Sequence, residues 1–254
     1  MDAMSTLQSI FRWFHILAGI VWIGHLYFFN FVNIPFQAVL DGGVKKQVNP
    51  ELLPRALFWF RWGAAWTWIT GVLLLMLVFY HGGLMFDMGA GWTAGAIIMV
   101  AFTFIAPFVY DALMSIEAMK NTRNAAIVGW VLTLVVVLLF IHVGGFGYRA
   151  YVIHVGAMFG TIMAFNVWFR IWPAQQKIIR AVKEGTPPPA DQVALAGLRS
   201  RHNTYLSIPL VWAMIDMHTV VPFAQSWIWL MVMIAAGWWL GTMFYRQSQK
   251  VKGF

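Results

Sequence analysis

The sequence predicts an all-α integral membrane protein, a bundle of about seven transmembrane helices that forms a single domain over residues 1–254. Hydrophobic residues make up 61% of the chain and charged residues only 10%, whereas about a quarter of a soluble domain is charged. The apolar residues also gather in runs of about 20, the length of helix that crosses a bilayer. The lipid bilayer is therefore the first expected partner.

Seven apolar runs are separated by polar breaks. The predicted spans cover residues 9–32, 57–81, 92–112, 124–144, 149–171, 203–221 and 226–246. We expect residues 33–54 to form a loop, because they contain three prolines and paired glycines. The polar segment 172–201 is expected to be a cytoplasmic loop with two short helices, at about 175–184 and 191–199, separated by Gly185 and three prolines.

The basic residues predict the orientation of the bundle. When the loops are assigned alternately to two sides, one side holds 15 of the 17 Lys and Arg residues and the other only Arg12 and Arg149. The positive-inside rule then places the N-terminus in the periplasm and the C-terminus in the cytoplasm. The net charge of +8 thus reports topology, and we expect no nucleic-acid partner.

The first apolar run carries two histidines, His15 and His25, about 15 Å apart along a helix axis. An ionisable side chain inside a membrane is costly and usually faces the bundle interior, where it has a partner. We therefore expect this helix to be the one to which the other helices supply partners.

Four histidines from four different spans are predicted at one depth in the outer leaflet, about 7–12 Å from the midpoint. They are His15, His142, His154 and His218. The chain has no cysteine, which excludes thiolate metal sites, iron–sulfur clusters and covalently attached haem. Haem b held by two axial histidines from facing helices fits such a group. The alternative for each histidine is a structural role, with the ring bonded to a neighbouring carbonyl.

Other residues extend this hypothesis. Arg12 and Arg149 are the only cations predicted on the outer side, and each lies within about a turn of a candidate ligand, so both are candidates to bind haem propionates. The alternative is that they anchor the helices at the interface. His25 and His202, on the cytoplasmic side, are candidate ligands of a second haem.

Two further features leave alternatives open. Asp216 lies two residues before His218 and indicates either a proton or quinol site or an acceptor that orients a ligand histidine. Gly156 and Gly160 have GxxxG spacing, which allows a helix or a flat ligand to approach closely, and plain helix packing is the favoured interpretation.

Three stretches form a spaced set of motifs: Phe11-Arg-Trp-Phe-His15 with Trp22-Ile-Gly24, the run Phe60-Arg-Trp-Gly-Ala-Ala-Trp-Thr-Trp-Ile-Thr-Gly71, and Arg201-His-Asn-Thr-Tyr-Leu-Ser-Ile-Pro209. Together they resemble the membrane domain of the bacterial urate hydroxylases, the urate oxidase N-terminal family. The resemblance implies a multi-pass protein of the bacterial inner membrane and urate oxidation coupled to cytochrome c. Family members usually continue into a cytochrome c domain. This chain stops at Phe254 without a cysteine, so we expect electrons to pass to a separate c-type cytochrome.

Three functions follow from these observations. The leading hypothesis is a haem b membrane protein, with one haem or two, that passes electrons between a donor and a periplasmic c-type cytochrome or other redox subunit. Quinol is a candidate donor. The second hypothesis is urate oxidation itself, and in both the chain is an oxidoreductase or an electron-transfer subunit of one. The third is a transporter whose His and Asp residues relay protons or hold a metal ion.

Overall fold

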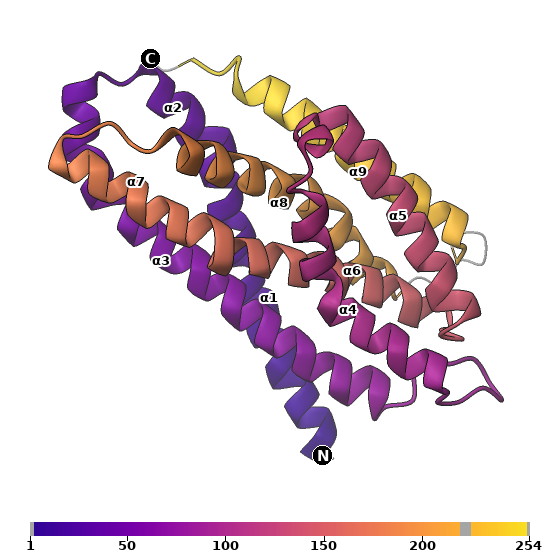
Figure 1. Cartoon of the computed structure of the whole chain (residues 1–254). Coiled ribbons are helices and arrows are strands. Elements are labelled where there is room, and N and C mark those ends of the chain that lie inside the picture. The colour runs from indigo at the N-terminus through magenta and orange to yellow at the C-terminus, as the bar shows by residue number, and fades with distance from the viewer. Residues whose placement is uncertain (1–2, 219–224, 253–254) are drawn as a thin grey trace.

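The computed structural model describes residues 3–218 and 225–252, which form helices joined by short connections (Figure 1). In chain order these are α1 (Ala3–Tyr27), η1 (Phe28–Asn33), α2 (Ile34–Val39), α3 (Gly42–Leu74), η2 (Leu75–Tyr80), α4 (Ala94–Leu113), η3 (Glu117–Lys120), α5 (Thr122–His142), α6 (Tyr148–Asn166), η4 (Val167–Ile171), α7 (Trp172–Glu184), α8 (Ala190–Asp216) and α9 (Trp227–Ser248). Within the described residues there is no strand, and six helical segments are long and apolar enough to cross a membrane. The all-α membrane class is therefore confirmed.

A seventh long helix, α8, is more polar and packs against α6 and α9. The prediction divided its residues between a short loop helix at 191–199 and a span at 203–221. In the structure the two segments form one continuous helix. Arg199 and Asn203, on either side of the predicted junction, are buried in the bundle. The helix ends at Asp216, and residues 219–221 of the predicted span lie outside the described residues. The other expected loop helix is present as α7, which ends at Gly185 with a φ of 75°.

The prediction of a loop at residues 33–54 was wrong. This region contains α2 and the first turns of α3, and Pro50 and Pro54 lie inside α3. Gln37 and Asn49 join the two helices, since each side-chain amide donates a hydrogen bond to the oxygen of the other at 2.8 and 2.9 Å. The beginning of α3 also packs against α7. These tertiary contacts outweigh the low helix propensity of proline and glycine.

The helix at the centre of the bundle is α6, not α1. Fourteen of the 19 residues of α6 are buried, whereas α1 buries only Ala18, Trp22 and Leu26. Most of α1 contacts α3 alone and leaves its remaining faces outward. The histidines of the first apolar run therefore do not mark the core of this bundle.

Glycines let α6 approach α8 closely. A Cβ atom on Gly156 would meet Met214 Cε at 3.1 Å and Ala213 Cβ at 3.3 Å, and one on Gly160 would meet Leu210 Cδ1 at 3.3 Å. The spacing thus serves helix packing, as the favoured interpretation held.

The two ends of the bundle differ in charge. Figure 1 shows α1 beginning at one end, and α2, the turn between α7 and α8, and the end of α9 at the other. We call the latter the basic end, because it carries the lysines and arginines of the segments 45–61, 120–123, 170–201 and 246–252. The charge pattern predicts an odd number of passes. In agreement, the beginning of α1 and the end of α9 lie at opposite ends of the bundle.

The orientation can be tested with single cysteines, because the chain has none of its own. Met88 is fully exposed at the end opposite the basic end, and Lys183 is exposed at the basic end. We expect a membrane-impermeant maleimide to label Met88→Cys in intact spheroplasts and to label Lys183→Cys only after lysis. The reverse pattern would show that the basic end faces the periplasm.

Candidate functional site

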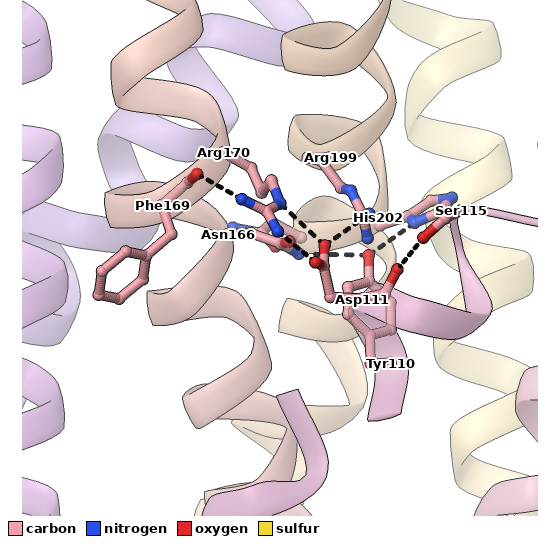
Figure 2. A network of polar contacts seen from close by, with 9 residues as sticks. Tyr110, Asp111, Ser115, Asn166, Phe169, Arg170, Arg199 and His202 are labelled. Carbon is pink, nitrogen blue, oxygen red and sulfur yellow. Dashed lines mark hydrogen bonds and ion pairs between the residues drawn. The ribbon is translucent and has the colours of Figure 1, made fainter. Parts of the chain in front are cut away.

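A carboxylate between two arginines joins three helical segments near the basic end (Figure 2). Asp111, near the end of α4, accepts hydrogen bonds from Arg170 Nε at 2.9 Å and from Arg199 Nη2 at 2.8 Å, both to Oδ1. Arg170 Nη2 donates to its other oxygen, Oδ2. The Arg199 side chain is only 5% exposed. Two cations facing one anion leave this partly buried cluster with a net positive charge.

Neutral polar groups continue the cluster. Asn166, at the end of α6, donates from Nδ2 to the Tyr110 hydroxyl at 3.2 Å and to Asn203 Oδ1 at 2.8 Å. The same hydroxyl lies 2.7 Å from His202 Nδ1. With the Tyr110 hydroxyl as the donor in this contact, the neutral imidazole carries its hydrogen on Nε2. The guanidinium of Arg199 lies 5.0 Å from the centre of the Tyr110 ring.

Three atoms of this network are buried without a hydrogen-bond partner in the described structure. They are Nε and Nη1 of Arg199 and Oδ1 of Asn166. Buried polar groups are nearly always paired, so unpaired ones indicate a missing water, ion or ligand. The network therefore offers two donors and one acceptor to a small polar molecule.

A largely apolar cavity of about 330 Å³ adjoins the network, between α4, α5, α6, α8 and α9. Its wall includes Tyr110 and His202, so the hydrogen-bonded pair borders both the network and the cavity. The other hydroxyl-bearing side chains on the wall are Thr122, Thr133, Tyr205 and Thr242. The hydroxyl of Thr133 is used within its own helix, where it donates to Gly129 O at 2.7 Å.

His154 of the predicted outer group is fully buried, and both of its ring nitrogens have protein partners. Nδ1 lies 2.7 Å from Ala150 O, and Nε2 lies 3.1 Å from the Tyr80 hydroxyl. Aromatic rings of Phe79, Phe140 and Phe146 surround it. This arrangement matches the structural alternative, a histidine bonded to a neighbouring carbonyl.

His15 lies at a different level of the bundle. Its Nδ1 contacts Thr67 O at 2.9 Å and Thr70 Oγ1 at 3.1 Å. Thr70 and Tyr80, the partner of His154, belong to one continuous helical segment, Gly42–Tyr80, and ten residues of it span about 12–15 Å. His15 and His154 are thus bonded to different levels of this segment.

The remaining members of the predicted outer sites are exposed side chains. His142 is exposed at the end of α5, and His218 is exposed just after α8. Arg12 and Arg149 are exposed on α1 and α6. The role of the outer histidines as haem ligands and of the two arginines as propionate partners stays a prediction.

The cytoplasmic candidates are separated too. His25 is half-buried on α1, with Nδ1 2.7 Å from Val21 O of its own helix. His202 lines the cavity, and no residue of α1 lies on the wall of that cavity. Asp216 accepts a hydrogen bond from the Tyr148 hydroxyl, which ties the ends of α6 and α8 together.

Sequence reasoning missed Asp111, Arg170, Tyr110 and Asn166, which come from segments far apart in the chain. Two of them could have been recognised from the sequence, because Asp111 and Arg170 are ionisable residues near the ends of predicted spans. Their opposite charges make them a candidate pair. Nothing in the sequence indicated that Arg199 would join them.

The ion cluster predicts a large stability effect. Asp111→Asn leaves Arg170 and Arg199 facing each other without a compensating charge, so we expect a loss of about 3 kcal/mol in the free energy of unfolding. The measurement is thermal or denaturant unfolding of the protein in detergent. Glu51→Gln is the matched control, because its pair with Arg55 is more than 70% exposed on both sides and such pairs contribute about 1 kcal/mol or less. Equal stability of the two variants would show that the cluster does not hold the helices.

Comparisons with known proteins identify the family of this chain. No curated protein and no solved structure matches it. The family model described as Urate oxidase N-terminal matches residues 2–253, nearly the whole length. This multi-pass membrane protein therefore belongs to the urate oxidase N-terminal family.

Proposed function

We propose that this chain is the membrane-embedded part of a urate-oxidising system, which takes electrons from urate and passes them to a separate c-type cytochrome. Membership of the urate oxidase N-terminal family over residues 2–253 supports the substrate. Hydroxylation of urate by one water releases two protons and two electrons, and a c-type cytochrome accepts one electron at a time, so two cytochromes are reduced for each urate.

The buried groups without hydrogen-bond partners at Arg199 and Asn166 support this proposal most directly. Urate is a planar anion at neutral pH, with C=O and N–H groups alternating along its edge. Arg199 Nε and Nη1 are donors for the C=O groups, and Asn166 Oδ1 is an acceptor for an N–H group. A site built to pair such groups rejects ligands that lack them.

The charge of the network supports the same ligand. Asp111 compensates only one of the two positive charges of Arg170 and Arg199, so a bound monoanion makes the cluster neutral. Hydrogen bonds from a guanidinium to an anion are about twice as strong as those between neutral groups. The side chains of α4, α6 and α8 are packed here, so they have to separate to admit the ligand. With the basic end in the cytoplasm, urate enters from that side.

Substitution of Arg199 tests this site. Arg199→Lys keeps the charge and a donor for Asp111 but loses the planar fork of N–H groups. We expect membranes that contain the wild-type chain to reduce added c-type cytochrome on addition of urate, followed by absorbance at 550 nm. In Arg199→Lys the KM for urate should rise at least tenfold, which corresponds to the loss of about one charged hydrogen bond.

Arg201→Lys is the control, since Arg201 is exposed on the same helix two residues away. Its kinetics should match the wild type. No urate-dependent reduction in the wild type would remove urate as the substrate. An equal KM in the two variants would move the urate site away from Arg199.

Haem b remains part of the expectation for electron transfer, because it would supply one-electron chemistry between donor and cytochrome. His15 and His154 are bonded to different levels of the segment Gly42–Tyr80, so haem ligation by the outer histidines stays a prediction. The prediction is a reducible Soret and α band in the purified protein, and loss of these bands in His154→Phe and His15→Phe if these residues are its ligands. Bands retained in both variants would exclude both residues. A protein with no such bands and no urate-dependent reduction would fit the transporter alternative.

A further inference from the structure

The cavity beside the network is large enough for a substituted ring. Its volume of about 330 Å³ is roughly twice the 150 Å³ that holds benzene in an apolar protein interior, and it falls in the range of small-molecule pockets. Val109, Leu132 and Trp239 on its wall are 51%, 42% and 64% exposed. Because these residues lie on membrane-spanning helices, the cavity opens toward the hydrocarbon of the bilayer. A ligand can therefore enter from the lipid.

The cavity wall carries two N–H donors that have no protein partner within the described residues. When Nδ1 of His202 accepts from the Tyr110 hydroxyl, the hydrogen of the neutral ring is on Nε2, which no described residue binds. In Figure 2 the His202 ring lies on the side of the network that is nearer to α9. Trp238, on α9, also lines the cavity, and its Nε1 is buried without a partner. A buried donor without an acceptor is costly, which favours a ligand that brings acceptors.

The balance of polar and apolar groups selects the class of ligand. A purine such as urate has several C=O and N–H groups, and most of them would be left unpaired against this apolar wall. A fatty acyl chain fills apolar space but offers no acceptor to either donor. A quinone carries two carbonyl acceptors on an apolar ring, and its isoprenoid tail can remain in the lipid.

We propose that this cavity binds a membrane quinone, with its carbonyl oxygens accepting hydrogen bonds from His202 Nε2–H and Trp238 Nε1–H. Arg199 lies behind Tyr110 and makes the polar end of the cavity positive, which favours the electron-rich carbonyl groups. The site is separate from the proposed urate site at Arg199 and Asn166, because neither of these residues lies on the cavity wall. Quinone binding needs neither urate nor cytochrome.

A substitution that fills the cavity gives the first test. A Cβ atom on Gly129, on the wall, meets only Trp238 Cη2, at 3.6 Å, so a leucine there extends into the cavity without a clash at its first atom. On α8, Gly197 has nothing within 4 Å of an added Cβ and does not line the cavity. Gly129→Leu and Gly197→Leu are therefore a matched pair.

The measurement is equilibrium binding of radiolabelled decylubiquinone to the purified full chain in lipid nanodiscs. We expect saturable binding by the wild type and by Gly197→Leu, and loss of binding in Gly129→Leu. His202→Phe keeps an aromatic ring but removes the donor, and should bind about tenfold more weakly. His202→Gln keeps an N–H donor and should restore most of that loss.

Three results would overturn the proposal: no saturable binding by the wild type, equal binding by Gly129→Leu, or equal binding by His202→Phe and the wild type. Competition by decylbenzene as strong as by unlabelled decylubiquinone would identify the cavity as a site for acyl chains. If Gly129→Leu does not fold, the comparison of quinone binding by His202→Phe and His202→Gln tests the proposal instead. Failure of urate-dependent cytochrome reduction leaves the binding result unaffected, so the two proposals fail separately.

Discussion

The carboxylate of Asp111 holds together helices that the chain itself leaves far apart. Within a bilayer no water is available to solvate a charge, so ionisable groups must be paired inside the protein. Asp111 forms an ion pair with both Arg170 and Arg199 and thereby links α4, η4 and α8. The positions of Tyr110, Asn166 and His202 follow, because each lies within a turn of one member of this cluster on the same helix.

Packing around α6 determines where the remaining space lies. The glycines of α6 draw α8 against it, and α4 packs along another face. Helix α5 packs against α9 and α6. The cavity lies between α4, α5, α6, α8 and α9, and its wall is largely apolar. A polar network and an apolar cavity thus lie side by side.

The Tyr110–His202 pair is shared by these two environments. Its hydroxyl belongs to the chain of hydrogen bonds that includes Asn166, and its imidazole borders the cavity. The pair therefore connects the hydrogen-bond network at the arginines with the wall of the cavity.

Local properties of the sequence determined the membrane class, six of the spans, the Gly185 helix end and the family, because run length, charge bias and motifs do not depend on distant residues. Tertiary structure decided the rest. The segment 33–54 is helical because of the Gln37–Asn49 pair and the contact with α7. His15 and His154 share a predicted leaflet but bind different levels of one helical segment. Depth along a helix follows from residue counting, whereas the direction in which a side chain points depends on which helices become neighbours. Packing and charge burial across the whole bundle determine which helices are neighbours, and this arrangement brings Asp111, Arg170 and Arg199 together.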